Sequence, residues 1–250
     1  MASDNLKAIL ASPSYRLAED DLDFLESDGA RAIRLALEFH RTDTYLHAFG
    51  IESTVVVFGS ARAPAPEDGR DGHPLARYYQ EARAFAQALS RGATHVEGCH
   101  RLVVATGSGP GIMAAANRGA SEAGAPTIGF NIRLPHEQHP NPWITPGLAF
   151  RFHYFALRKM HFLLRARALV AFPGGFGTLD EVYEALNLVA TRTIEPIPIV
   201  LVGREYWSRM LDLDHLVAEA LIGAPEAALV HRCETGAEAA RHVLEHCGCG

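Results

Sequence analysis

Residues 168–187 read Ala-Leu-Val-Ala-Phe-Pro-Gly-Gly-Phe-Gly-Thr-Leu-Asp-Glu-Val-Tyr-Glu-Ala-Leu-Asn. The first five residues are apolar without polar alternation, which is typical of a strand covered on both faces of a parallel sheet. Pro173 ends that strand, and apolar residues then recur at helical spacing from Val182 to Val189. The stretch therefore predicts a strand, a tight turn and a helix, which is the repeating unit of an α/β sheet.

The turn between this strand and this helix has the composition of an anion-binding loop. Gly174, Gly175 and Gly177 let a ligand approach the backbone closely, and Thr178 is a good N-cap. The free N–H groups and the positive dipole end of a helix start favour a phosphate. A structural interpretation stands beside this one, because Thr178 and Glu181 also have the spacing of a capping box. The spacing alone leaves both interpretations open.

A helical pattern at residues 154–167 precedes this stretch and carries Arg158 and Lys159. The chain has two lysines, Lys7 and Lys159, against twenty-one arginines. Because so arginine-rich a chain keeps one interior lysine, we expect a compact ammonium group to be needed at residue 159. For Arg158, the sequence leaves open a role in a site and a plain ion pair on the helix surface.

Strand and helix patterns alternate along the rest of the chain. Apolar runs predict further strands at 54–58, 102–106, 127–131 and 197–203. Helical signals predict helices at 75–91, 112–123, 206–216 and 235–245. This alternation predicts an α/β fold, a Rossmann-like doubly wound parallel sheet with helices on both faces.

The length of 250 residues and the hydrophobic content of 48% suit one such domain with a large core. We expect residues 1–52 to form an N-terminal helical extension and residues 53–250 to form a single Rossmann-like domain. The extension has apolar residues at helical spacing between Asp28 and Phe49 and no catalytic constellation.

The net charge of −6 and the pI near 6.1 argue against a general nucleic-acid binder and against a membrane-surface protein, because phosphate backbones and anionic lipids would be repelled. No run of 18 or more apolar residues occurs, and the start Met-Ala-Ser-Asp-Asn-Leu-Lys lacks the regions of a signal peptide. We therefore expect a cytoplasmic protein.

Two further glycine turns follow predicted strands. Residues 59–62 contain Gly59 and Ser60, and residues 107–111 have the spacing G-x-G-x-G, with glycines at 107, 109 and 111. Neither a dinucleotide fingerprint nor a P-loop is present, because the required glycine spacing and the Lys-Ser or Lys-Thr pair are missing. Strand-to-helix turns of a parallel sheet emerge at one edge, so we expect all three glycine turns to converge into a nucleotide pocket.

A proline-rich segment, residues 133–146, cannot be a regular helix. Long proline-stiffened loops are often functional. His136, Glu137 and His139 lie in this segment, and the sequence leaves open whether they cover a ligand or are solvated loop residues.

The four cysteines, Cys99, Cys233, Cys247 and Cys249, are typical of reduced thiols rather than of a disulfide framework. Near the C-terminus, His242 and His246 lie four residues apart, close to Cys247 and Cys249. We weigh a metal site there against a frayed tail and expect no metal.

Four motifs in order make the chain similar to the Lonely Guy (LOG) family, whose members are often labelled lysine decarboxylases. These motifs are Val57-Phe-Gly-Ser-Ala-Arg62, Thr106-Gly-Ser-Gly-Pro-Gly-Ile-Met113, Leu134-Pro-His-Glu-Gln138 with Pro140-Asn-Pro142, and Arg158-Lys159 followed by Pro173-Gly-Gly-Phe-Gly-Thr-Leu-Asp-Glu181. The resemblance covers roughly residues 53–203. It implies hydrolysis of the N-glycosidic bond of a nucleoside 5′-monophosphate, AMP or an N6-modified cytokinin nucleotide, to a free base and ribose 5-phosphate.

The resemblance also implies roles for individual residues. Arg158 and Glu181 match the catalytic pair of the family. The residues matching its substrate and phosphate contacts are Gly59, Ser60, Gly107, Gly109, Gly111, Lys159, Gly174, Gly175, Gly177 and Thr178. A homo-oligomer, either a dimer or a hexamer, is implied, with no cofactor. Ser108 departs from the commonest family spelling, which has a glycine there, and this puts the choice of substrate in doubt.

Three other functions compete with this one. The pocket of a related molybdenum-cofactor carrier binds a nucleotide-like cofactor without cleaving it, although the presence of both Arg158 and Glu181 argues against that function. A lysine decarboxylase would need a Schiff-base lysine, for which Lys159 is the interior candidate. A structural scaffold would give no reason for three glycine turns at one edge.

Overall fold

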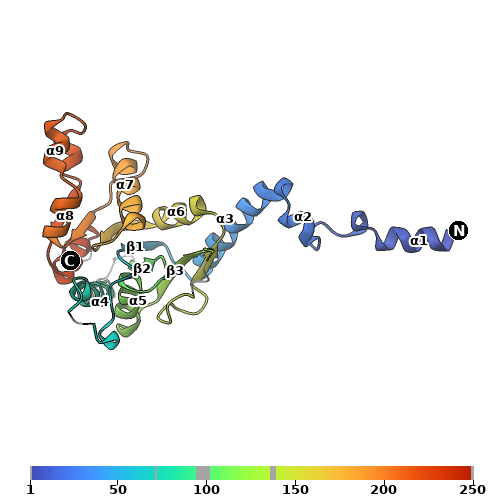
Figure 1. Cartoon of the computed structure of the whole chain (residues 1–250), viewed down its shortest axis with the longest axis horizontal. Helices are drawn as coiled ribbons and strands as arrows, with labels where there is room; N and C mark the ends of the chain where they lie inside the picture. The colour runs from blue at the N-terminus through green and yellow to red at the C-terminus, as the bar shows by residue number, and fades with distance from the viewer. Residues whose placement is uncertain (1, 71, 94–101, 136–138, 249–250) are drawn as a thin grey trace. The chain divides into compact units, whose positions relative to one another are not determined.

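The computed structural model of the chain describes residues 2–70, 72–93, 102–135 and 139–248 (Figure 1). Two compact units are present, residues 1–44 and residues 45–250. The first unit holds α1 (Ala2–Ala11), α2 (Leu22–Glu26) and most of α3 (Arg31–Ala48), which continues into the second unit. The predicted helical character of the N-terminal region is thereby confirmed. No helix in the described ranges combines the length and the apolar run that crossing a bilayer requires.

The described part of the second unit forms one sheet of seven strands in the order β4-β3-β2-β1-β5-β6-β7. Every neighbouring pair is parallel. The strands are β1 (Ser53–Phe58), β2 (Leu102–Thr106), β3 (Thr127–Ile132), β4 (Ala149–Phe152), β5 (Ala166–Ala171), β6 (Ile199–Val202) and β7 (Val230–Cys233). The predicted doubly wound parallel sheet is confirmed.

The two edge strands, β4 and β7, were not predicted from the sequence. In β4, Phe150 and Phe152 are buried while Ala149 and Arg151 are exposed, and four residues are too few for a clear alternating pattern. In β7, Cys233 alone is buried. β4 is a strand because it pairs with β3, and β7 is a strand because it pairs with β6. The residues of each short segment do not by themselves indicate this pairing.

Proline shapes the start of β6. Pro198 lies immediately before Ile199, the first residue of the strand. β6 itself is an interior strand, between β5 and β7. The carbonyl of Pro198 still accepts a hydrogen bond from Leu169 of β5, which a proline can do because it lacks only the donor.

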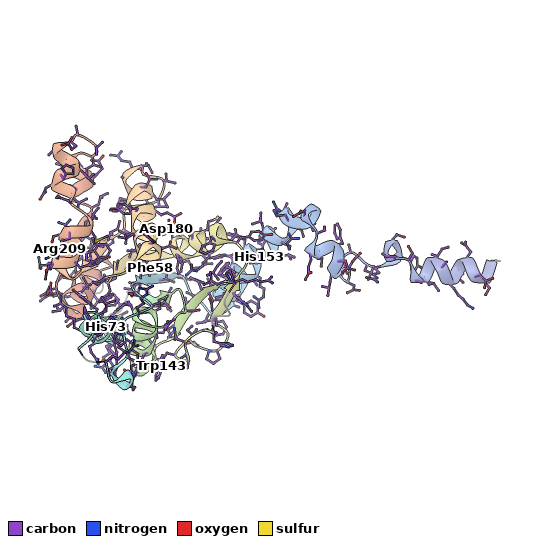
Figure 2. The ribbon with its side chains drawn as sticks, viewed as in Figure 1. Phe58, His73, Trp143, His153, Asp180 and Arg209 are labelled. Atoms are coloured by element: carbon purple, nitrogen blue, oxygen red, sulfur yellow. The ribbon has the colours of Figure 1, made fainter. Side chains whose placement is uncertain are left out.

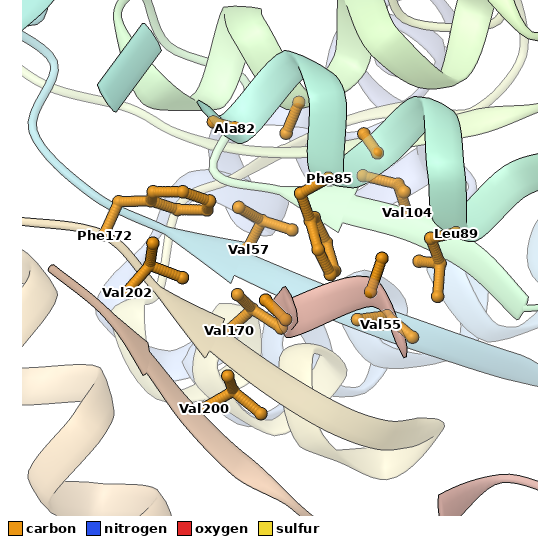
Figure 3. Close-up of a cluster of buried hydrophobic side chains, with 14 of the residues drawn as sticks. Val55, Val57, Ala82, Phe85, Leu89, Val104, Val170, Phe172, Val200 and Val202 are labelled. Atoms are coloured by element: carbon orange, nitrogen blue, oxygen red, sulfur yellow. The ribbon is translucent and has the colours of Figure 1, made fainter. Parts of the chain in front are cut away.

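One face of the sheet is covered by α4 (Ala76–Gly92), α5 (Ile112–Glu122) and α11 (Gly236–His246). Figure 3 shows Phe85 and Leu89 of α4 lying over valines of the central strands. The buried residues of α4 recur at helical spacing along the side that faces the sheet, namely Tyr78, Ala82, Phe85, Ala86 and Leu89. Burial of such side chains supplies roughly 1.5–3 kcal/mol each, which fixes the central strands as a rigid platform.

The opposite face carries α6 (Phe155–Leu164) and α7 (Phe176–Ala190). Phe162 of α6 packs edge-on against Phe58 and Phe130, with ring centroids 4.9 Å and 5.4 Å away. The predicted helix over residues 154–167 is too long, because the chain leaves α6 after Leu164 to enter β5 at Ala166.

The C-terminal part contains α8 (Arg204–Met210), α9 (Leu213–Ala218) and α10 (Ala224–Ala227). The single helix predicted over 206–216 is wrong, because Asp212 starts a new helix by accepting a hydrogen bond from the N–H of His215 at 3.0 Å. The prediction that Thr235 opens the last helix is confirmed, since its hydroxyl accepts from the N–H of Glu238.

Candidate functional site

The strand order creates a crevice at the carboxyl ends of β1 and β5. The chain winds outward from β1 through β2 and β3 to β4, then returns to the other side of β1 and continues through β5, β6 and β7. Ligands of open α/β sheets bind where the winding direction reverses. In this chain the reversal lies between β1 and β5, so the turn after each of these strands borders the crevice.

The backbone N–H and carbonyl of Ser60 form hydrogen bonds that join the three glycine turns. Its N–H donates to the carbonyl of Pro173 at 3.0 Å, and its carbonyl accepts from the N–H of Ile112 at 3.1 Å. A side chain at Gly111, where φ is +67°, would lie 2.3 Å from the Ser60 carbonyl oxygen. The structure thus brings together the turns at 59–62, 107–111 and 173–178, and a glycine at residue 111 is required for their close approach.

The start of α7 is exposed and carries backbone donors that no acceptor in the helix uses. Phe176 and Gly177 are the first two helical residues, so their N–H groups have no acceptor within the helix. Gly175, Phe176 and Gly177 are all exposed, and a side chain added at Gly175 or Gly177 would meet no atom within 4 Å. Donors at the positive end of a fifteen-residue helix can therefore reach a phosphate.

The predicted N-cap at Thr178 is wrong. Gly175 is the N-cap of α7, and Thr178 is the third helical residue, buried with its hydroxyl where a side chain at Gly174 would lie. The capping-box interpretation of Glu181 is also wrong, because a capping box would need its glutamate at residue 178. Helical geometry instead puts Thr178 and Glu181 on the same face of α7, about one turn apart.

Glu181 is a buried carboxyl group. Its exposed fraction is 6%, and among the described residues its carboxylate accepts no hydrogen bond. Burial raises the pKa of Glu181 to about 7, against the opposing effect of Lys159 and Arg158. A carboxyl group that titrates near neutral pH can both stabilise positive charge and exchange a proton.

Arg158 connects the glycine turn of residues 107–111 to α6. Its Nε–H donates to the carbonyl of Phe130 at 2.8 Å, and its guanidinium carbon lies 5.0 Å from the centre of the Phe162 ring. Burial lowers the pKa of Arg158, while the charge of Glu181 raises it. The side chain of Arg158 is half-buried and binds a carbonyl of β3, and the nearby charge of Glu181 raises its pKa. The interpretation of Arg158 as a plain ion pair on the helix surface is therefore not supported.

Lys159 lies on the outer side of the same helix pair. Its ammonium group binds Asp180 at 2.8 Å and Glu184 at 3.0 Å, both from α7. Burial lowers the pKa of Lys159, but the hydrogen bonds to these two carboxylates raise it more. Two of the three N–H donors of this ammonium group are therefore used within the protein, and the predicted phosphate contact of Lys159 stays a prediction.

Sequence reasoning missed two residues that hold the glycine turns. The hydroxyl of Tyr206 in α8 donates a short hydrogen bond to the carbonyl of Gly174. Asn141 binds the carbonyls of Ser108 and Gly109 through its side-chain amide, at 3.1 Å each. A polar residue enclosed by prolines, as in Pro140-Asn-Pro142, was the available signal for Asn141, whereas nothing in the sequence distinguished Tyr206.

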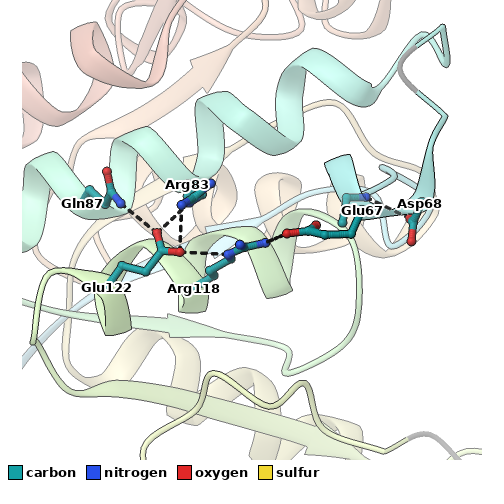
Figure 4. A network of polar contacts seen from close by, with 7 residues as sticks. Glu67, Asp68, Arg83, Gln87, Arg118 and Glu122 are labelled. Atoms are coloured by element: carbon teal, nitrogen blue, oxygen red, sulfur yellow. Dashed lines mark hydrogen bonds and ion pairs between the residues drawn. The ribbon is translucent and has the colours of Figure 1, made fainter.

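Arg118 of α5 contacts two loops, one containing Glu67 and one containing Trp143. Its guanidinium binds Glu67 at 2.5 Å and Glu122 at 2.9 Å, and Glu122 also binds Arg83 of α4 (Figure 4). The guanidinium carbon of Arg118 also lies 4.9 Å from the centre of the Trp143 ring, which Figure 2 locates beside α5. One arginine therefore connects the short 3-10 turn at Pro66–Asp68 with the proline-rich segment.

Two cavities lie outside the glycine turns. One of about 1050 Å³ is bordered by Ser53, Leu102 and Ala166, at the amino ends of the strands, and so opens at the edge of the sheet opposite the turns. Another of about 410 Å³ is lined in part by Tyr78 and Tyr206. We place the candidate site by its backbone donors and its buried carboxyl group.

Three of the four residues considered as a C-terminal metal site lie in the described part of the chain, namely His242, His246 and Cys247. The ring of His242 stacks face to face on that of His231, with ring centroids 3.7 Å apart and planes 8° apart. Within the described ranges no group of three metal-binding side chains has suitable geometry. Cys99, Cys249, His136 and Glu137 lie outside the described residues. His139 is exposed.

Solved structures confirm the fold. The chain is similar to the molybdenum cofactor carrier protein of Chlamydomonas reinhardtii, with 24% identity, a TM-score of 0.54, and coverage of 79% of this chain and 99% of the carrier. It is also similar to the molybdenum cofactor binding protein of the phototrophic bacterium Rippkaea orientalis, with 18% identity, a TM-score of 0.52, and coverage of 78% and 96%. No curated protein matches the sequence.

A family model described as "Possible lysine decarboxylase" matches residues 113–243. This match spans more than half of the 250 residues, and it includes the 173–178 turn, Arg158 and Glu181. The chain belongs to the family with that description, the Lonely Guy (LOG) family.

Proposed function

We propose that this protein hydrolyses the N-glycosidic bond of a nucleoside 5′-monophosphate, AMP or an N6-modified AMP, to a free base and ribose 5-phosphate. One observation carries the proposal. The N–H groups that start α7 and the buried carboxyl group of Glu181 lie on one helix, a turn or so apart. A nucleotide whose phosphate binds the helix start would have its sugar near that carboxyl group.

The reaction needs no cofactor in this proposal. Cleavage of the C1′–N bond sends the electron pair to the base and builds positive charge on the ribose, as in glycoside hydrolysis. The carboxylate of Glu181 stabilises this charge and accepts a proton from the attacking water, whose oxygen bonds to C1′. The proton finally resides on the released base, so atoms and charge balance. Near pH 7 both protonation states of Glu181 are populated, which suits the transfer.

Arg158 supports the same chemistry by its charge. It is held against the carbonyl of Phe130 and reaches the turn at Gly107, so its guanidinium group is fixed beside the proposed sugar site. A fixed cation keeps part of the Glu181 population ionised, since it lowers the pKa of that carboxyl group.

Decarboxylation of lysine, which the family description suggests, is disfavoured by the contacts of Lys159. A Schiff-base lysine must be neutral to attack an aldehyde, whereas the pKa of Lys159 is raised by its two carboxylate partners.

The test is incubation of the protein with a panel of nucleoside monophosphates, with chromatography of the released base. We expect AMP or an N6-modified AMP to yield free base and ribose 5-phosphate. Glu181→Gln should bind the nucleotide with nearly unchanged affinity but release base about 10²–10³ times more slowly. Tight binding without release by the wild-type protein would favour a carrier, and absence of binding would contradict both functions.

Self-association is part of the proposal. Apolar side chains that are about half exposed lie along α6, namely Phe155, Met160 and Leu164. Exposed apolar surface favours contact with another protein surface. We expect an oligomer of at least two copies in analytical ultracentrifugation. Met160→Glu should shift it toward the monomer, while Leu221→Glu, on an exposed residue of the C-terminal part, should not.

A further inference from the structure

Asn141 is buried, and both polar ends of its side chain and its backbone N–H form hydrogen bonds. Its exposed fraction is 9%. The side-chain amide donates to Ser108 O, Gly109 O and Asn117 Oδ1 at 3.1, 3.1 and 2.9 Å, while the amide oxygen accepts from the N–H of Trp143 at 3.2 Å. Its backbone N–H donates to Ser108 O at 2.8 Å. Two successive carbonyls of the glycine turn therefore point at one residue of the proline-rich segment.

A second layer of polar residues holds Asn141 in this orientation. Thr106 donates to Asn117 Oδ1 at 2.7 Å, and Asn117 donates to Thr127 Oγ1 at 2.5 Å. These residues come from β2, α5 and β3, and all are fully buried. A satisfied network of this kind fixes the side-chain amide of Asn141, because any flip would place two donors or two acceptors against each other.

The held residue, Ser108, has an unfavourable backbone conformation. Its φ is +64°, in the left-handed region that costs a non-glycine residue roughly 1 kcal/mol or more. Its side chain is fully buried, and the hydroxyl has no hydrogen-bond partner among the described residues. The bonds to Asn141 offset this cost and keep the turn in a shape that it would not adopt alone.

The direction of the Ser108 carbonyl determines the direction of the Gly109 N–H. None of the described peptide bonds is cis, and in a trans peptide the C=O of one residue points opposite to the N–H of the next. Because the Ser108 carbonyl points to Asn141, the N–H of Gly109 points to the opposite side, away from the proline-rich segment. This N–H donates to no described residue.

Sheet spacing places that donor relative to the helix start. β2 and β5 lie on either side of β1, so the strand ends that carry the two turns are about two strand spacings, roughly 10 Å, apart. Two donors at that separation cannot bind the same phosphate group. A nucleotide whose phosphate lies at the start of α7 would present its sugar and base, not its phosphate, to Gly109.

We infer that Asn141 is a positioning residue that turns the Gly109 N–H toward the sugar and base half of a bound nucleoside monophosphate. This inference rests on the proposed function. Asn141 would thus favour a nucleotide over phosphate alone without touching the ligand. Gly109 would contact the sugar or base and not the phosphate.

The test compares two probes, AMP and inorganic phosphate, by calorimetric titration of the full chain. Asn141→Asp keeps the size of the side chain but places an acceptor against two carbonyls, so the turn should rotate. We expect the Kd for AMP to rise roughly tenfold, the loss of one good hydrogen bond, while the Kd for phosphate stays within twofold. Asn187→Asp, the same change on an exposed residue of α7, should alter neither value.

Asn141→Ala provides a second variant in case the aspartate prevents folding, and the same split between AMP and phosphate is expected. Equal weakening of both probes in these variants would indicate a merely structural role and overturn the inference. Unchanged AMP binding would overturn it as well, while base release by the wild-type protein would still support the proposed function. Failure of the wild-type protein to bind AMP would overturn both.

Discussion

The guanidinium of Arg158 occupies the space that a side chain at Gly107 would need. A Cβ atom built at residue 107 would lie 2.5 Å from Nη2 of Arg158, while the Nε–H of that arginine binds the carbonyl of Phe130. Because residue 107 has no side chain, the guanidinium group of Arg158 can lie against the turn at residues 107–111.

Gly107→Ala is expected to displace the Arg158 guanidinium with little loss of stability, because the clash involves the far ends of two flexible side chains and φ is not positive. Activity should fall at least about tenfold, since the charge opposite Glu181 moves. Steady-state rates with AMP and thermal unfolding would measure the two effects. Gly72→Ala, where a Cβ meets nothing within 4 Å, is the control and should change neither. A fully active Gly107→Ala would contradict this role of the arginine.

Glu181→Gln should lose activity but gain stability at alkaline pH. Burial raises the pKa of Glu181 to about 7 from 4.5, so the folded state holds a proton that the unfolded chain releases. Wild-type stability contributed by this group is complete below pH 4.5 and is lost as pH rises through 7. The glutamine variant escapes this loss, worth roughly 3 kcal/mol at pH 8.

Urea unfolding at pH 8 and at pH 4.5 would measure this difference. We expect the variant to be more stable than the wild-type protein at pH 8 and the two to converge at pH 4.5. A glutamine variant that is less stable at both values would mean that the carboxyl group is held by favourable interactions in its charged form. Glu195→Gln, the same change at an exposed carboxyl group, is the comparison.

Lys159→Gln should move the pH profile of kcat/KM. For the wild-type protein we expect the rate to rise with pH through about 7, as Glu181 ionises. Lys159 is the strongest influence that lowers the pKa of Glu181, so its removal should shift the rise to higher pH. Phosphate affinity should stay unchanged, because the ammonium is bound to Asp180 and Glu184. Lys7→Gln serves as the control. A large loss of phosphate affinity would restore Lys159 to the binding site.

Tyr206→Phe should loosen the turn at residues 173–178, where we propose that phosphate binds. The hydroxyl of Tyr206 donates to the carbonyl of Gly174, and its removal leaves that carbonyl without this donor. We expect a stability loss of about 1 kcal/mol and a several-fold weaker affinity for inorganic phosphate. Tyr15→Phe, on an exposed residue of the N-terminal region, should have no effect on either measurement. Unchanged phosphate affinity in Tyr206→Phe would argue that the helix start alone fixes the anion.

The sequence predicted the central strands and the glycine turns well, because their signals are local. A short apolar run such as Val55–Phe58 is typical of a buried strand, and glycine directly after it predicts a turn. The edge strands β4 and β7 escaped prediction because their pairing partners, not their own residues, make them strands. The N-cap of α7 was misplaced by three residues, since Gly175 gives no side-chain signal and Thr178 gives a false one.

The sequence by itself determined the α/β class, the three turns and the identity of the ionisable residues near them, because each depends on neighbours within about ten positions. Only the tertiary structure decided that Glu181 is buried and titrates near 7, that Lys159 is bound to two carboxylates, and that Asn141 holds Ser108. Burial, charge pairing and hydrogen bonding across the sheet join residues from different elements. These properties exist only once the strands have packed side by side.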